Sequence, residues 1–189
     1  MRWFNHPSKS QVAFLNKHVG RRVIELYCGP EPLFDLCQDL SWAIGVDKED
    51  YSHLPNVKGR KDLQWELVQK WIPEHEEEWA TSDTVIMCYP PNNDLRPSDA
   101  MALQMMHKDQ TLILVVPRPW HNLMVAGSHL FWQHLFSDFW LYGASEITGG
   151  NLDIIYSLGK RRIDGAQPAI AIMEGHKLFE LQGDRLAAG

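Results

Sequence analysis

The segment from residue 23 to residue 47, VIELYCGPEPLFDLCQDLSWAIGVD, most constrains what this chain can fold into. It reads as a short buried strand, a tight turn at Gly29, a helix, and a second strand that ends at Asp47. A turn of this kind lets a ligand approach the backbone, and a carboxylate after the second strand can accept hydrogen bonds from ribose hydroxyls. The pattern therefore predicts a pocket for a nucleotide-like ligand.

Runs of strand length alternate with amphipathic runs along the rest of the chain. We expect strands at residues 23–26, 43–46, 84–88, 111–116, 139–142, 153–158 and 169–173. We expect helices at residues 11–18, 31–40, 62–71, 98–107 and 122–135. This alternation predicts a Rossmann-like α/β fold, with a mostly parallel sheet and helices on both faces. A turn-rich stretch at residues 148–151 leaves no room for a helix, so the sheet should finish in a C-terminal antiparallel hairpin.

Length and composition fit a single globular domain. The chain has 189 residues, of which 44% are hydrophobic and 22% charged, enough to bury one core. We expect one domain over residues 1–189, made of an N-terminal helical segment (1–20), a core sheet (21–175) and a C-terminal tail (176–189). No apolar run approaches the roughly 20 residues of a membrane helix, and the N-terminus lacks the apolar stretch of a secretory signal.

Cysteine, histidine and charge patterns narrow the function further. Cys28, Cys37 and Cys88 form no even-numbered framework and no CxxC pair, so a reduced, cytoplasmic setting is expected. The nine histidines form no HExxH motif, and we expect no metal site. The formal net charge of −6 weighs against a stand-alone, high-affinity nucleic-acid binder, although basic residues gather at 58–61 and 160–162.

Two motifs carry a family resemblance. The run ELYCG at residues 25–29, followed by GVD at residues 45–47, resembles the first two motifs of class I S-adenosylmethionine-dependent methyltransferases. That family has a Rossmann-like sheet with a reversed last strand, and the resemblance covers nearly the whole chain in element order. It implies S-adenosylmethionine as the cofactor. It also implies four cofactor-binding residues, Glu25, Tyr27, Gly29 and Asp47.

One departure from the family pattern concerns the glycine-rich turn. Glu31 stands where the family usually has another glycine. A glutamate there is expected to crowd the backbone's approach to the ligand and to bring negative charge near the ligand's carboxylate. This departure keeps open a second interpretation, a catalytically inactive methyltransferase-like binding or partner subunit.

The third signal is a hydrophobic strand that runs directly into two prolines. Pro-Pro fixes an extended backbone at the carboxyl edge of the sheet, where open α/β sheets bind ligands. In amino-methyltransferases this segment reads Asp or Asn, then Pro-Pro, then an aromatic residue, and it holds and stacks on the target amine. Here the flanking residues are exchanged, and a structural relic is the alternative interpretation. The resemblance implies as catalytic residues Tyr89, Pro90, Pro91 and Asn92.

Two shorter segments add candidates. Several adenine-N6 methyltransferases carry a Pro-Ser or Pro-Thr segment beside the methionine part of the cofactor, which implies cofactor contacts for Pro7 and Ser8. An ordinary helix start is the alternative. After the strand expected at residues 111–116, Arg118 and Trp120 are of the types that hold phosphate and stack on a flat ring, so we expect them to bind substrate. Trp120 could equally cover the core.

Taken together, the motifs predict an S-adenosylmethionine-dependent methyltransferase that acts on an amino nitrogen. The exocyclic N6 amine of adenine in nucleic acid fits the motif order best, so nucleic acid is the expected partner. Two alternatives stay open: a catalytically inactive methyltransferase-like subunit that binds a ligand or a protein partner, and a methyltransferase for small molecules or proteins. We expect no membrane association.

Overall fold

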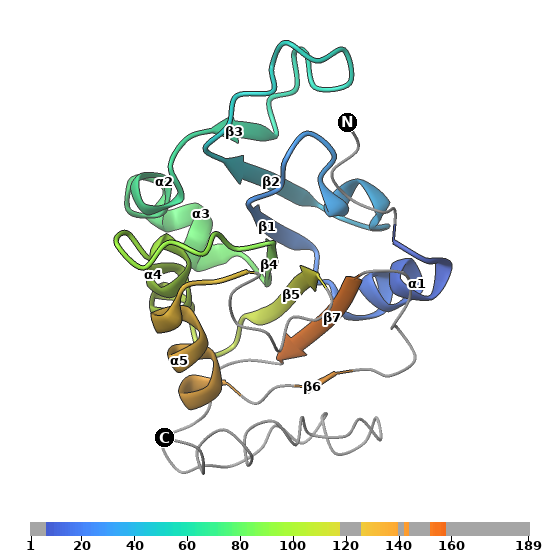
Figure 1. The fold of residues 1–189 in the computed structure, drawn as a ribbon. Coiled ribbons are helices and arrows are strands. Elements are labelled where there is room, and N and C mark those ends of the chain that lie inside the picture. Colours follow the sequence, from blue (N-terminus) through green and yellow to red (C-terminus); the bar gives the residue numbers. More distant parts are fainter. Residues whose placement is uncertain (1–6, 118–125, 140–141, 144–151, 158–189) are drawn as a thin grey trace.

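The computed structural model describes residues 7–117, 126–139, 142–143 and 152–157. Its seven-stranded sheet has the order β3-β2-β1-β4-β5-β7-β6 (Figure 1). The strands are β1 (Arg22–Leu26), β2 (Trp42–Asp47), β3 (Leu63–Trp65), β4 (Thr84–Cys88), β5 (Thr111–Pro117), β6 (Tyr142–Gly143) and β7 (Leu152–Ser157). The first five pair in parallel, whereas β7 runs antiparallel to both β5 and β6. The predicted α/β sheet and its antiparallel end are confirmed.

Alternating side chains of the central strands supply two separate cores, as the period of two in a strand requires. In β4, Val85 and Met87 face one core, and Ile86 and Cys88 face the other. All four are buried because the sheet is covered on both faces.

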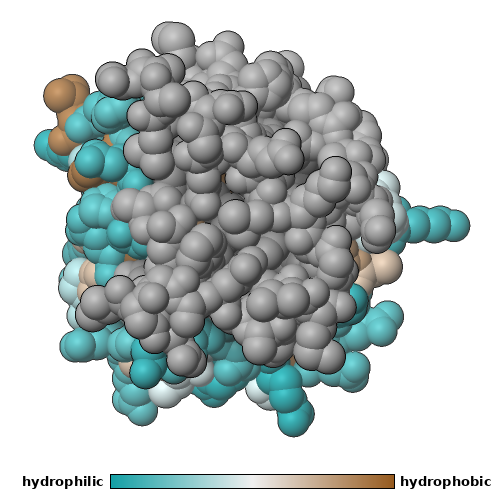
Figure 2. Space-filling view, turned by 90° about the horizontal axis from the view of Figure 1, so that it is seen from below, coloured by the Kyte–Doolittle hydropathy of each residue, from teal (hydrophilic) through white to brown (hydrophobic). Residues whose placement is uncertain are grey.

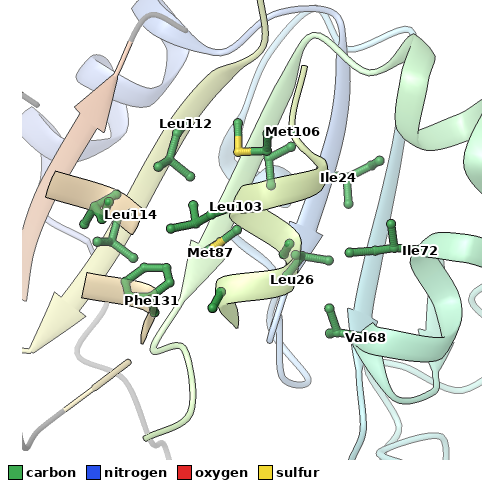
Figure 3. Close-up of a cluster of buried hydrophobic side chains, with 14 of the residues drawn as sticks. Ile24, Leu26, Val68, Ile72, Met87, Leu103, Met106, Leu112, Leu114 and Phe131 are labelled. Carbon is green, nitrogen blue, oxygen red and sulfur yellow. The ribbon is translucent and has the colours of Figure 1, made fainter. Parts of the chain in front are cut away.

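Helices cover the first face densely. They are α2 (Val68–Glu74), α3 (Glu76–Thr81), α4 (Ser98–Met105) and α5 (His129–Asp138), which lie along one side of the sheet in Figure 1. Leu103 of α4 and Phe131 of α5 pack towards Met87 and Leu114 of the sheet (Figure 3). This face forms the larger core, with buried tryptophans at Trp71 and Trp79.

The second face is covered more thinly. It carries α1 (Lys9–His18), the 3-10 turn η1 (Leu33–Leu36) and the long β2–β3 loop, residues 48–62. Phe14, Phe34 and Val57 anchor these three segments to the sheet. Helices therefore lie on both faces, as predicted, but unevenly.

Two predicted helices are wrong. The helix expected at 31–40 is only the short turn η1, because Pro30 and Pro32 lack amide hydrogens and both flank Glu31, which restricts its backbone. The helix expected at 62–71 begins as strand β3, since Leu63–Trp65 pairs in parallel with the end of β2. A helix starts only at Val68.

The other helix predictions agree better. The helices expected at 11–18 and 98–107 are α1 and α4. The helix expected at 122–135 starts at His129, and residues 122–125 lie outside the described residues. The strand expected at 169–173, the turn at 148–151, the basic group at 160–162 and the tail at 176–189 also lie outside them. No helix among the described residues is long and apolar enough to cross a membrane.

Candidate functional site

The turn after β1 folds tightly against the end of β2. Gly29 has a φ of 59°, which glycine adopts at no steric cost. Tyr27 has a φ of 60°, an uncommon conformation for a bulky residue. Its amide donates to the Val46 carbonyl at 2.8 Å, and its hydroxyl lies 3.0 Å from Ser98 Oγ at the start of α4. Burial raises the pKa of the Tyr27 hydroxyl, which therefore stays protonated.

Asp47, at the end of β2, holds this turn in place. Its Oδ2 accepts from the Gly29 amide at 2.9 Å, and its Oδ1 accepts from the Glu49 amide at 3.0 Å. Burial raises the pKa of the half-buried Asp47 carboxyl, while these two backbone bonds oppose that rise. Each carboxylate oxygen keeps a second lone pair, which a ligand hydroxyl can use.

Glu25 is wholly buried on the second face, and its carboxylate binds backbone amides of the protein. Its carboxylate accepts from the amides of Leu33 at 2.9 Å and Phe34 at 3.0 Å, which stabilises the first turn of η1. The thiol of Cys88 donates to Oε1 at 3.3 Å. Burial raises the pKa of Glu25 to about 7 despite these donors.

A cavity of about 750 Å³ opens at the carboxyl ends of β1, β2 and β4. Its size lies within the range of about 300–1,000 Å³ that is usual for small-molecule sites. Tyr51 forms part of its wall and packs edge-on against Trp65, with ring centroids 5.7 Å apart. The lining residues used below are Tyr27, Gly29, Asp47, Tyr51, Leu67, Tyr89, Pro91, Asn93 and Arg96.

A second cavity, of about 250 Å³, adjoins the first on the thinly covered face. The two cavities share Pro30, Cys88 and Tyr89 as lining residues. The smaller cavity is bordered further by Pro7, Glu25, Glu31, Pro32, Leu33, Asp35 and Arg60. A ligand that bends around Tyr89 would occupy both.

Polar contacts close the smaller cavity. Arg60 of the 48–62 loop donates to Asp35 of η1 at 2.6 and 2.8 Å, and it also pairs with Asp62. These two carboxylates, Asp62 first, raise the pKa of the Arg60 guanidinium. Asn56 donates to the Pro30 carbonyl at 3.0 Å. These hydrogen bonds tie the 48–62 loop to η1 and to the turn before it.

Tyr89 stands at the junction of the two cavities. Its φ is 50°, and its amide donates to Val115 of β5 at 2.9 Å, so the strained backbone is held by the sheet. Burial raises the pKa of Tyr89 to about 12, which keeps its hydroxyl protonated and able to donate a hydrogen bond. The next carbonyl, that of Pro90, accepts from the Gly127 amide at 2.7 Å.

Comparisons with known proteins agree with this topology. No family model and no curated protein sequence matches the chain. The fibrillarin/Nop5p complex matches with a TM-score of 0.53 and 12% identity, over 80% of this chain and 81% of that one. Human N-acetylserotonin methyltransferase in complex with SAM matches with a TM-score of 0.51 and 12% identity, over 80% of this chain and 51% of that one. Precorrin-6y C5,15-methyltransferase from Geobacter metallireducens GS-15 matches with a TM-score of 0.50 and 9% identity, over 84% of this chain and 92% of that one.

The chain has the class I methyltransferase fold. This methyltransferase fold brings most of the sequence-predicted residues to one edge of the sheet. Tyr27, Gly29 and Asp47 border the larger cavity, and Pro7 and Glu25 border the smaller one. Their assignment as cofactor ligands stays a prediction.

Other predicted residues are placed less favourably. Ser8 forms a capping box with Gln11 at the start of α1, and its contact with the cofactor stays a prediction. Asn92 is exposed and does not border the two cavities, whereas Pro91 borders the larger one. Arg118 and Trp120 lie outside the described residues. The side chain of Glu31 is exposed and borders the smaller cavity.

Sequence reasoning missed four of these lining residues of the larger cavity, Tyr51, Leu67, Asn93 and Arg96. The only signal for Asn93 and Arg96 is their position just after the two prolines, which is shared with Asn92. Cys28, Cys37 and Cys88, the three cysteines of the chain, all carry free thiols. Among the described residues, no group of three or more His, Cys, Asp or Glu side chains is placed to hold a metal ion.

Proposed function

We propose that this chain binds S-adenosylmethionine across the two adjoining cavities and transfers its methyl group to an amino nitrogen. The observation that carries the proposal is the junction at Tyr89, with Asp47 in the larger cavity and Pro7 beside the smaller one. The adenosine part would lie in the larger cavity, and the methionine part in the smaller one. The human enzyme described above was solved in complex with the same cofactor.

The larger cavity offers the groups that an adenosine needs. Asp47 has a free lone pair on each carboxylate oxygen for the ribose hydroxyls. Tyr51 and Leu67 supply flat and apolar surface for the adenine ring. The turn at Gly29 brings backbone close to the ligand without a side chain in the way.

The smaller cavity offers an apolar lining and negative charge. Pro30, Pro32 and Leu33 would contact the aliphatic part of the methionine moiety. Glu31 would attract its ammonium group, whereas Asp35 is already paired with Arg60. Arg60 is already bound by two carboxylates, so the carboxylate of the ligand would point out of this cavity.

In this reaction the protein would mainly position the amine against the methyl group. The sulfonium of the cofactor supplies an activated methyl group, so a close and aligned approach of the amine accounts for most of the rate. The Tyr89 ring would stack on the heterocycle that carries the amine, and its protonated hydroxyl would donate a hydrogen bond. Pro90 is buried, borders neither cavity and accepts from the Gly127 amide, so its part would be to hold Tyr89 in position.

For the amine we propose an exocyclic amine on a nucleic-acid base, with adenine N6 as the specific candidate. The Pro-Pro segment and the adjacent tyrosine support this choice. A second candidate is an inactive, cofactor-binding scaffold. It is favoured by the Pro90 carbonyl, which already accepts a hydrogen bond, and by Asn92, which does not border the two cavities.

Calorimetric titration with S-adenosylmethionine and S-adenosylhomocysteine tests cofactor binding. We expect Asp47→Ala to weaken both by about 1–3 kcal/mol, because ribose hydrogen bonds in a partly buried site are lost. Asp50→Ala is the matched control, since Asp50 is exposed on the same loop and borders neither of the two cavities. An unchanged dissociation constant for Asp47→Ala would remove its ribose role.

Transfer of a labelled methyl group tests catalysis separately. We expect Tyr89→Ala to abolish transfer and to leave cofactor affinity close to that of the wild type. Loss of both together would mean that Tyr89 supports the fold of the loop. Cofactor binding by the wild type without transfer to nucleic acid, protein or small amines would favour the inactive scaffold.

A further inference from the structure

Asp99, at the start of α4, is a buried carboxylate that the proposed reaction does not use. On the face drawn in Figure 2 the described side chains are mostly hydrophilic, as expected at a surface, whereas Asp99 and Ser128 are wholly buried. Asp99 Oδ2 accepts from the Ser128 amide at 2.6 Å, and Oδ1 accepts from the Ser128 hydroxyl and the Ala100 amide, both at 2.8 Å. These three donors offset the cost of burying the charge. Asp99 therefore fixes the segment that leads into α5 against the start of α4.

The residue before Ser128 holds the segment that follows β4. The Gly127 amide donates to the Pro90 carbonyl at 2.7 Å. Gly127 has a φ of 77°, and a Cβ built there would lie 2.7 Å from the ring of Phe131, so both the conformation and the space require glycine. Because Asp99 binds both the amide and the hydroxyl of Ser128, it also fixes the direction of the neighbouring Gly127 amide.

Tyr89 needs this support because its backbone is strained. Its φ of 50° is uncommon for a bulky residue, and such a conformation persists only where the surrounding structure fixes it. On one side the Tyr89 amide is bound to Val115 of β5, and on the other the Pro90 carbonyl is bound by Gly127. The second of these bonds depends on Asp99. The place of the Tyr89 ring at the junction of the two cavities therefore depends on a carboxylate that borders neither of them.

Ser98, which precedes Asp99, contacts the other strained tyrosine of the site. Its Oγ lies 3.0 Å from the hydroxyl of Tyr27, whose φ is 60°, and it borders the larger cavity. Tyr27 belongs to the turn that Asp47 holds through the Gly29 amide. Two adjacent residues at the start of α4 thus reach both sides of the site, the cofactor turn through Ser98 and the segment after β4 through Asp99.

We propose that Asp99 is a positioning residue for methyl transfer, which sets the place of the Tyr89 ring relative to the cofactor turn. It acts through the Gly127 amide and the Pro90 carbonyl, and not by contact with cofactor or substrate. Ser98 has the corresponding part on the cofactor side. The inference rests on the proposed function, because a displaced ring lowers the rate only if that ring stacks on the heterocycle that carries the amine.

Asp99→Asn is the decisive variant. Asparagine keeps the shape of the side chain but replaces one accepting oxygen by a donor, so at least one of the three bonds is lost. We expect the single-turnover rate of labelled methyl transfer to heat-denatured, unmodified DNA to fall about tenfold or more at saturating cofactor. The dissociation constant of S-adenosylmethionine should change less than about twofold, because Asp99 borders neither cavity.

Two milder variants keep the test informative if Asp99→Asn does not fold. Ser128→Ala keeps the amide bond to Asp99 and removes only the hydroxyl, so its rate should fall between those of Asp99→Asn and the wild type. Ser98→Ala should show the reverse split, with cofactor affinity about fivefold weaker and a smaller loss of rate, because it releases Tyr27. A rate for Ser128→Ala equal to that of the wild type would overturn the positioning role.

Gln110→Ala is the matched control for a general loss of stability. Gln110 is buried at the amino edge of the sheet, where its Nε2 donates to the Trp79 carbonyl at 2.8 Å and to Ser82 Oγ at 2.7 Å. Its Oε1 accepts from the His107 amide at 2.7 Å, and it borders neither of the two cavities. We expect Gln110→Ala to lower stability towards urea but to keep the transfer rate of the folded protein. Equal losses of rate in Gln110→Ala and Asp99→Asn would overturn the inference.

Amide hydrogen exchange separates this inference from the proposed function. In Asp99→Asn the Gly127 amide should exchange about tenfold faster or more, while the Leu114 amide in the middle of the sheet stays as protected as in the wild type. This measurement requires neither cofactor nor transfer. Unchanged protection of Gly127 would overturn the role of Asp99 even where the wild type transfers methyl groups. Absence of transfer by the wild type would overturn the proposed function and the part of Asp99 in it, whatever the exchange shows.

Discussion

Among the described residues, one face of the sheet carries four helices, whereas the other carries one helix, a single 3-10 turn and a loop. The first face is closed by apolar packing, with Leu103, Phe131 and Trp71 fully buried or nearly so. The second face combines a smaller apolar cluster, which includes Phe14, Phe34 and Val57, with polar contacts between its segments. Arg60 joins the loop to η1, and Asn16 of α1 donates to the Leu36 carbonyl at 3.1 Å.

This difference places the smaller cavity on the thinly covered face and the larger one at the adjoining sheet edge. A face closed by apolar packing leaves no space at native density. A face with a smaller apolar cluster, whose segments are tied together by hydrogen bonds and ion pairs, can leave a cavity beside Glu25 and Leu33, as it does here. The densely packed face then supplies the rigidity, because it holds β4 and hence Tyr89 at the cavity junction.

A matched pair of leucines tests the comparison most strongly. Leu114→Ala removes a fully buried side chain between sheet and helices, and we expect it to lower the free energy of unfolding by about 4 kcal/mol. Leu33→Ala on the thin face should lower it by only about 1 kcal/mol, because Leu33 is partly exposed and already borders a cavity. Urea unfolding measures both values. Equal losses would contradict the difference between the faces.

Glu25 gives a test with a defined pH dependence. Its pKa is about 7 in the folded protein, against 4.5 ordinarily, so the folded state binds more protons between these values. Stability is therefore highest below pH 4.5 and falls as the pH rises through 7, by up to about 3 kcal/mol for this group. We expect Glu25→Gln to remove that fall, measured by urea unfolding at a series of pH values.

The control for this measurement is Glu77→Gln, because Glu77 is exposed on α3 of the other face. The control should keep the pH dependence of the wild type. The opposite result would be a wild-type protein that gains stability, relative to Glu25→Gln, between pH 4.5 and pH 7. The amides of η1 would then lower the pKa of Glu25 by more than burial raises it, which would contradict this account.

The same contrast explains which predictions from the sequence succeed. The sheet is predictable because each strand is a short apolar run, and parallel strands bring Asp47 and Tyr89 to one edge wherever helices fall. The thin face is not predictable. Pro30 and Pro32 weigh against a helix at residues 31–40, but the two bonds from the η1 amides to the buried Glu25, which hold the turn, form only in the folded chain.

Site residues follow the same rule. Gly29 predicts a turn from the sequence alone. The positive φ of Tyr27 cannot be predicted, because it depends on the hydrogen bond from the Tyr27 amide to Val46 in the sheet. The sequence also does not show that Asn93, and not Asn92, borders the larger cavity. Asn93 folds its own side chain back onto Leu95 and Arg96, and this local turn decides which asparagine borders the cavity.

The smallest expected effect concerns the clamp at Arg60. Its partners Asp35 and Asp62 are 44% and 39% exposed, so we expect Arg60→Ala to lower the free energy of unfolding by only about 1 kcal/mol. Because the clamp ties the 48–62 loop to η1, limited proteolysis within that loop should nonetheless accelerate markedly. Arg60→Lys should restore little, since a single ammonium cannot reproduce the paired geometry of the guanidinium.

Lys70→Ala is the matched control for the clamp, because Lys70 pairs with Glu66 and Glu74 on the helix-covered face. It removes a more exposed ion pair from a segment that apolar packing already holds through Trp71 and Ile72. We expect no change in proteolysis of the 48–62 loop. If Arg60→Ala and Lys70→Ala behave alike, polar contacts do not hold the thin face, and the loop must be anchored by Val57 instead.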